Sequence, residues 1–83
     1  MDVLQSVRGV LDAVLSLNGR AAAYSRDTLL LGALPELDSM AVVALIAGIE
    51  DRFGIVIEDD EISGDSFATV GTLADFVAAK LAG

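Results

Sequence analysis

The residues best suited to chemistry are Asp38 and Ser39, which stand immediately before a long apolar segment. Nucleophilic catalysis by a serine requires a neighbouring base, and zinc or thiolate chemistry requires histidine or cysteine. The 83-residue chain contains no histidine and no cysteine, so nothing within it can activate Ser39. We therefore expect Ser39 to be the substrate of another enzyme, which attaches a covalent group that the chain then carries.

Two other groups of acidic residues resemble parts of a calcium site or a catalytic site, but each lacks a residue that such a site requires. Segment 59–64 resembles the start of a calcium-binding loop, yet the twelfth position of that loop is Val70, where a bidentate glutamate is needed. The adjacent carboxylates at 50–51 and 58–59 have no partner base for general acid–base catalysis. The sequence therefore predicts no catalytic residue, no metal site and no enzymatic activity.

Hydrophobic periodicity predicts a single all-α domain over residues 1–83. The predicted elements are a helix over about 2–16, a second over about 38–53, a short helix over about 59–66 and a last helix from Thr69 onward. Asn18-Gly19 and Gly54 are stop signals for the first two helices, and Asp38 and Thr69 are suitable N-caps. The expected architecture is a small bundle of three longer helices and one short helix.

The segment that joins the first two helices, about residues 17–37, is long and rich in leucine. Its leucines need to be buried, so we expect the segment to lie across the helices. The last helix is expected to bury Val70, Leu73, Ala74, Val77 and Leu81. The small side chain of Ala74 leaves room for an apolar tail between the helices, or simply allows the helices to pack closely.

The second helix has two apolar faces. One face is the predicted core stripe, formed by Val42, Leu45, Ile46, Ile49 and Phe53. The opposite face consists of Met40, Val43, Ala44 and Ala47, with Glu50 and Asp51 one turn further on. This second face either packs under the leucine-rich segment or serves as a docking strip with an acidic rim. We favour the docking strip.

The negative charge of the chain is concentrated in one segment. Residues 36–65 contain nine acidic residues and one base, Arg52, whereas the rest of the chain holds four acids and four bases. Such a surface should repel nucleic acids and anionic membranes and attract partners that present Arg and Lys, although the acids also serve solubility. No apolar stretch approaches the ~20 residues that span a bilayer, so we expect no stable membrane insertion. We also expect a cytoplasmic location and a monomer.

Several stretches of the chain together resemble the acyl carrier protein family. Asp38-Ser39-Met40 follows Leu31-Gly32 and opens a helix that ends in Glu50-Asp51-Arg52-Phe53-Gly54. The acidic turn 55–61 and the segment 67–73, which opens the last helix, extend the match. The resemblance covers essentially the whole chain and implies an acyl-carrier-protein-like four-helix bundle with a long first loop.

The resemblance also implies a function. A phosphopantetheinyl transferase would attach 4′-phosphopantetheine to Ser39, while Asp38 would help to hold the magnesium ion of the transferase. The thiol of the attached group would hold an acyl group as a thioester for use in fatty acid or lipid biosynthesis. An acyl-activating ligase or an acyltransferase, with basic docking patches, would act on the carrier. The implied recognition face consists of Met40, Val43, Ala44, Ala47, Glu50 and Asp51.

Two features differ from carriers of general fatty acid synthesis. Those carriers usually have acids where this chain has Ala41 and Ala44, and about two residues where five separate Gly32 from Asp38. The longer insertion is similar to that of a specialised bacterial group associated with exosortase and exopolysaccharide systems. The alternatives are a peptidyl or aminoacyl carrier, whose usual Gly-Gly-His/Asp-Ser context is missing, and a helical interaction module that is never modified.

Overall fold

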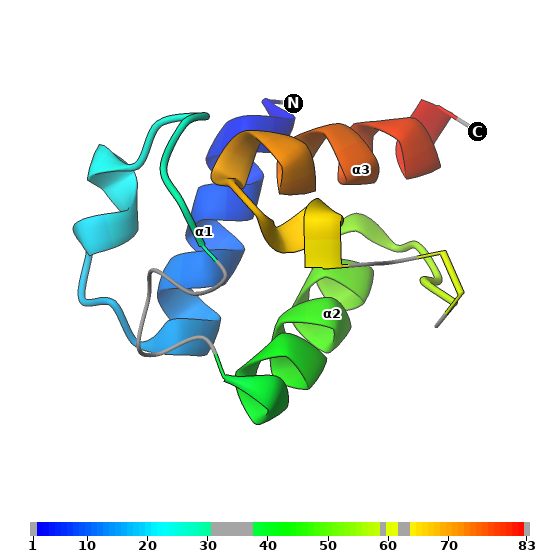
Figure 1. The fold of residues 1–83 in the computed structure, drawn as a ribbon, viewed down its shortest axis with the longest axis horizontal. Helices are drawn as coiled ribbons and strands as arrows, with labels where there is room; N and C mark the ends of the chain where they lie inside the picture. Colours follow the sequence, from blue (N-terminus) through cyan, green and yellow to red (C-terminus); the bar gives the residue numbers. More distant parts are fainter. Residues whose placement is uncertain (1, 31–37, 59, 62–63, 83) are drawn as a thin grey trace.

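The computed structural model describes residues 2–30, 38–58, 60–61 and 64–82. These residues form three α-helices, α1 (Val3–Leu15), α2 (Ser39–Phe53) and α3 (Val70–Ala82), and two short 3-10 helices, η1 (Arg20–Ala23) and η2 (Gly64–Phe67) (Figure 1). Within the described residues the only β pairing is an isolated bridge between Leu29 and Thr69. The all-α class and the three longer helices predicted from the sequence are confirmed.

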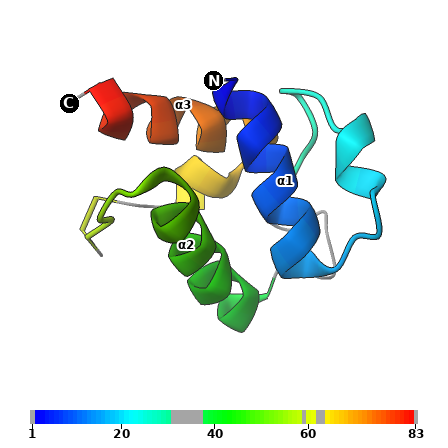
Figure 2. The ribbon, with the colours of Figure 1, turned by 180° about the vertical axis from the view of Figure 1, so that it is seen from behind.

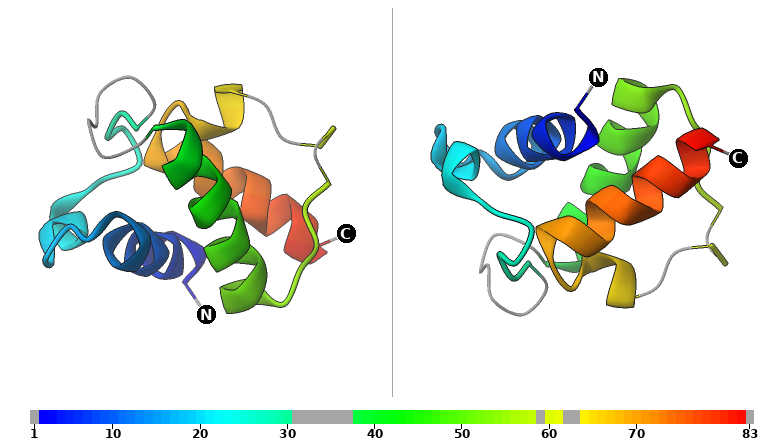
Figure 3. Two further views of the ribbon diagram at one scale, coloured as in Figure 1. Left: turned by 90° about the horizontal axis from the view of Figure 1, so that it is seen from below. Right: turned by 90° about the horizontal axis from the view of Figure 1, so that it is seen from above.

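Helix α1 holds the other two helices together. It packs closely against both α2 and α3, whereas the backbones of α2 and α3 make far fewer close approaches to each other. In Figure 1, α3 lies across the top and α2 across the bottom, with α1 running between them, and Figure 2 shows the same arrangement from behind. Figure 3 shows that η1 lies beside α1, on the side away from α2.

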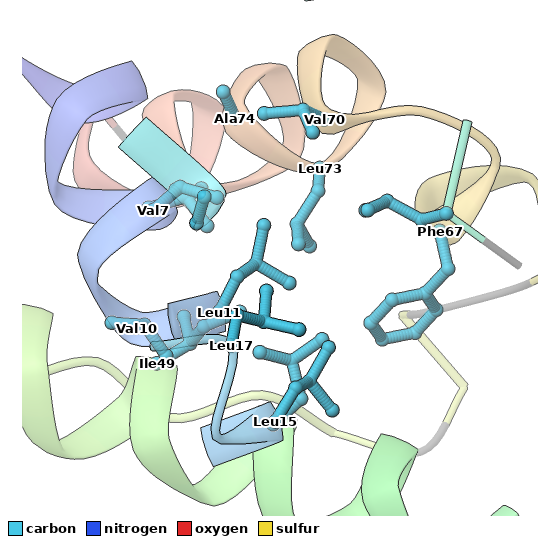
Figure 4. Packing of buried hydrophobic residues seen from close by; sticks show 14 of the residues in the cluster. Val7, Val10, Leu11, Leu15, Leu17, Ile49, Phe67, Val70, Leu73 and Ala74 are labelled. Atoms are coloured by element: carbon cyan, nitrogen blue, oxygen red, sulfur yellow. The ribbon is translucent and has the colours of Figure 1, made fainter. Parts of the chain in front are cut away.

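The core lies where the three helices meet, and the predicted apolar faces point into it. Leu11 of α1, Ile49 of α2 and Leu73 of α3 are completely buried and belong to one cluster (Figure 4). Leu45 of α2 is also completely buried, while the other predicted core residues of this helix pack against the edge of the cluster. Connecting segments complete the core with Leu17, Leu30 and Phe67.

Polar side chains of α1 fix the segment that follows it. The Arg8 guanidinium donates to the carbonyl oxygens of Ala22 (3.4 Å) and Tyr24 (3.0 Å). The Asp12 carboxylate accepts from the backbone N–H of Ala21 at 3.3 Å. These bonds hold η1 alongside α1, although the sequence indicated only a loop over 17–37.

Two burial predictions are wrong. Leu29 is 60% exposed rather than buried, because residues next to it pair along the backbone with the start of α3 and only Leu30 turns into the core. Leu81 is 44% exposed, because the last turn of α3 extends beyond the core (Figure 1). Predictions for the leucines at 31, 34 and 37 lie outside the described residues.

The predicted short helix over about 59–66 differs in part from the structure. Residues 60–61 form a turn and η2 covers Gly64–Phe67, with Phe67 buried in the core, while residues 59, 62 and 63 lie outside the described residues. Thr69 caps α3 as predicted, because its hydroxyl accepts from the backbone N–H of Thr72 at 3.1 Å. The Thr72 hydroxyl in turn accepts from the N–H of Thr69 at 3.0 Å, which fixes the entry into α3.

Candidate functional site

Asp38 determines where α2 begins. Its backbone is extended (φ −103°, ψ −173°), and its Oδ1 accepts a hydrogen bond from the N–H of Ala41 at 2.8 Å. Its carbonyl oxygen accepts from the N–H of Val42 at 2.9 Å, which closes the first helical turn. Asp38 is therefore the N-cap that the sequence predicts, and Ser39 is the first residue of α2. The side chain of Ser39 lies outside the described part of the structure.

The electrostatic setting of this helix start suits a covalently attached phosphate. The N-terminus of an α-helix carries a partial positive charge that favours anions. From Ser39 to Ile49 the helix has no charged residue, and Arg52 stands in its last turn. No side chain along this stretch supplies a cation to capture a free phosphate, and the Asp38 carboxylate would repel one. The residues therefore fit a phosphate group that is bonded to the chain.

The outer face of α2 exposes apolar side chains. Met40 is 81% exposed and Val43 is 68% exposed, while Ala44 and Ala47 are also exposed. Exposed large apolar side chains gathered on one helix face are typical of interaction sites. The four residues that the sequence groups together thus share a solvent-facing surface, which we call the α2 outer face.

Glu50 and Asp51 differ in their surroundings, although both belong to the acidic rim predicted from the sequence. The Glu50 side chain is half-buried, and its Oε2 accepts from the backbone N–H of Ile57 at 2.7 Å. The carbonyl oxygen of Glu50 also accepts from the N–H groups of Gly54 (2.9 Å) and Ile55 (3.2 Å). Asp51 is exposed, and its carboxylate has no hydrogen-bond partner within the described residues.

This difference has a consequence for stability. An exposed acid such as Asp51, which has no hydrogen-bond partner within the described residues, can be replaced at little cost. Replacing Glu50 would also remove the acceptor for the Ile57 N–H, and a buried donor without an acceptor costs about 1–3 kcal/mol. No sequence signal indicates this bond, because a loop separates its two partners.

The chain folds into three α-helices, and the second of them begins at a serine that follows the N-cap Asp38 and lies in an uncharged part of the helix. Together these features define a helical carrier domain. The family described as phosphopantetheine attachment site matches residues 36–77, about half of the chain, including Asp38 and Ser39. The solution NMR structure of a holo acyl carrier protein from Nitrosomonas europaea is 46% identical in sequence, covers 100% of both chains and superposes with a TM-score of 0.93. A comparison with curated protein sequences found no match. The chain belongs to the acyl carrier protein family.

Membership of this family defines the prosthetic group and the class of activity. Acyl carrier proteins bear 4′-phosphopantetheine and have no catalytic activity of their own. They are acted on by a phosphopantetheinyl transferase and by enzymes that handle acyl groups. Within the described residues no helix is both long and apolar enough to cross a bilayer, and no group of potential ligands gathers for a metal ion.

Proposed function

We propose that Ser39 is the attachment residue and that the chain delivers acyl groups to partner enzymes in a specialised bacterial pathway. The observation that carries this proposal is the position of Ser39 as the first residue of α2, directly behind the N-cap Asp38 and inside the matched region 36–77. The holo state of the 46% identical carrier supports the same attachment chemistry.

In the proposed modification, the hydroxyl oxygen of Ser39 forms a phosphodiester bond with the phosphopantetheine phosphate of coenzyme A. The pyrophosphate bond of coenzyme A breaks, adenosine 3′,5′-bisphosphate leaves, and a base of the transferase takes the hydroxyl proton. The positive end of α2 stabilises the new phosphodiester charge. When attached, the group supplies a terminal thiol that holds the acyl chain as a thioester.

Asp38 has two proposed tasks at this site. Its Oδ1 caps α2 through the N–H of Ala41, which keeps the first turn of the helix intact beneath the modified residue. A carboxylate has further lone pairs, so Asp38 can also take part in binding the magnesium ion of the transferase. The ion belongs to the transferase complex and leaves with it.

Partner enzymes are proposed to dock on the α2 outer face. Its exposed apolar residues, Met40 and Val43 above all, supply contact area, and the acids at the end of the helix attract Arg and Lys of a ligase or acyltransferase. Because the first three turns of α2 are uncharged, this face differs from the one expected for general fatty acid synthesis. We also propose that the carrier acts in the cytoplasm. The specialised pathway that we propose is one associated with exopolysaccharide or exosortase systems.

The decisive experiment measures the intact mass of the protein after incubation with coenzyme A and a broad-specificity phosphopantetheinyl transferase. Wild type should gain one phosphopantetheine mass, and Ser39→Ala should gain none. Ser66→Ala, which changes a serine of the segment before α3, should be modified as wild type. Modification of the Ser39→Ala protein, or none of the wild type, would contradict the proposal.

A further inference from the structure

The hydrogen bond between Glu50 and Ile57 joins the end of α2 to the segment that follows it. Side-chain exposure varies along this segment: Ile55 is half-buried, Val56 is 67% exposed and Ile57 is 8% exposed. The side chain of Ile57 belongs to the core, and its N–H points to the Glu50 carboxylate over 2.7 Å. Val56 lies in the chain between the end of α2 and Ile57, so fixing Ile57 restricts the backbone on both sides of the exposed Val56.

We propose that Glu50 is a positioning residue that holds Val56 as an extension of the α2 outer face, and that Asp51 carries the docking charge there. This inference rests on the proposed docking function and divides the roles of two adjacent acids. Glu50 acts through Ile57, since its Oε2 is engaged by the Ile57 N–H. Asp51 is exposed and its carboxylate is free to pair with a partner cation.

The surface around Val56 indicates the chemistry of its partner. Val56 is 67% exposed and lies just beyond the end of α2, so it adds apolar area at that end of the helix, and burial of apolar area is a main driving force of association. The exposed acids Asp51, Glu58 and Asp60 stand close to Val56 in the chain. The fitting partner is therefore a protein surface with an apolar side chain bordered by Arg or Lys.

A hydrogen bond between a carboxylate and a backbone N–H is strong enough for this positioning role. Hydrogen bonds to charged groups are stronger than those between neutral groups. The N–H groups of Gly54 and Ile55 also donate to the carbonyl oxygen of Glu50, and these two bonds stabilise the same turn. Glu61, further along the chain, is bonded to Lys80 of α3, so the segment is fixed at both ends.

The experiment uses the full chain and a broad-specificity phosphopantetheinyl transferase as the docking probe. Steady-state loading with coenzyme A gives KM and kcat for Glu50→Ala, Glu50→Gln, Asp51→Asn and Val56→Ala. We expect Val56→Ala to raise KM about threefold to tenfold with little change in kcat, since up to two buried CH₂ equivalents are lost. Asp51→Asn should raise KM about twofold to fivefold and reduce its dependence on salt.

The two Glu50 variants separate positioning from charge. Glu50→Ala removes the acceptor, so it should raise KM and expose the Ile57 amide to faster hydrogen exchange, measured by NMR. Glu50→Gln keeps an acceptor oxygen without the charge. Compared with Glu50→Ala, it should restore most of the protection of the Ile57 amide from exchange and bring KM back close to the wild-type value. A merely structural role would change exchange and leave KM at its wild-type value, which would overturn the inference.

Two further outcomes would also overturn it. If Glu50→Gln reduces the salt dependence of KM as strongly as Asp51→Asn, Glu50 is itself a docking charge. If Val56→Ala loads with wild-type KM, the docking surface ends at α2. Asp27→Asn, which removes an exposed acid from the segment that follows η1, controls for net charge. Failure of wild type to be loaded at all contradicts the proposed function instead, while the hydrogen-exchange result remains independent of it.

Discussion

The backbone N–H of Gly71 donates to the carbonyl oxygen of Arg26 over 2.9 Å. The Arg26 guanidinium also donates to the Asp75 carboxylate of α3 at 2.7 Å. These two bonds join the segment after η1 to the first turns of α3, and neighbouring pairs between Leu30 and Ala68 and between Val70 and Thr28 continue the contact. The first loop is thus bonded to the last helix, although about 40 residues of sequence separate them.

This contact leaves no room for a side chain at position 71. A Cβ added to Gly71 would lie 2.9 Å from the Arg26 carbonyl oxygen and 3.1 Å from the Arg26 Cβ. We predict that Gly71→Ala lowers the free energy of unfolding by about 1–3 kcal/mol, because the backbone must shift. Urea denaturation measures the effect.

Gly9→Ala is the matched control. A Cβ there meets no atom within 4 Å, and alanine favours a helix interior by about 0.5–1 kcal/mol over glycine. Gly9→Ala should therefore raise stability. If both substitutions raise it, the close approach at Gly71 has no energetic importance.

A second prediction concerns acid. Both carboxylate oxygens of Glu61 accept from the Lys80 ammonium at 2.8 Å, and this bond, followed by the bond from the Glu58 N–H, lowers the pKa of Glu61. The folded state thus favours the ionised form, so the stabilisation is complete above the unfolded pKa of about 4.3 and is lost as pH falls through the lower folded pKa. Glu61→Gln should melt below wild type at neutral pH, and the gap should close in acid.

Thermal melts of wild type and Glu61→Gln between pH 7 and pH 3 measure this gap. In a Lys80→Met background the effect of Glu61→Gln at neutral pH should be smaller, because of the two partners only the Glu58 N–H remains. A gap that persists at the acid end would mean that the carboxylate charge is not its source.

A third prediction separates the two tasks proposed for Asp38. Asparagine is as good an N-cap as aspartate, so Asp38→Asn should melt close to wild type, whereas Asp38→Ala should lose about 1 kcal/mol. The transferase needs the carboxylate charge, so both variants should be loaded more slowly in the intact-mass assay. Normal loading of Asp38→Asn would show that Asp38 serves as a cap only.

A fourth prediction concerns the cargo. A medium or long acyl chain left in water costs about 0.8 kcal/mol per CH₂, so a carrier gains stability by enclosing the chain. We expect the melting temperature of the loaded protein to rise with chain length over that of the unacylated form. A flat series would indicate an exposed tail and favour a short or polar cargo such as an amino acid.

The helices and the core were predictable because burial imposes a 3.6-residue period on the sequence. The apolar positions of α1 and the residues Leu45 and Ile49 of α2 repeat with that period, and all are buried or packed against the core as expected. Asp38 and Gly54 were predictable as the start and stop of α2 because each residue type suits a particular backbone geometry. The left-handed conformation of Gly54 (φ 66°) is the one that ends helices.

The features that were missed depend on contacts between distant residues. Helix η1 is a single short 3-10 element, fixed by Arg8 and Asp12 of α1 rather than by any period of its own. Leu29 and Leu30 are identical neighbours, and only the backbone pairing with α3 decides which of them is buried. The partner of the Glu50 carboxylate is likewise set by the path of the loop, which the sequence does not encode locally.

The central position of α1 has a consequence for how this carrier can be divided. The matched region 36–77 begins after α1, yet α1 supplies the close packing that joins α2 to α3. A fragment cut at those boundaries would leave Ile49 and Leu73 facing water instead of Leu11. Carrier fusions and minimal substrates derived from this chain should therefore retain the sequence from α1 onward, because the segment 36–77 alone lacks the helix that packs against both α2 and α3.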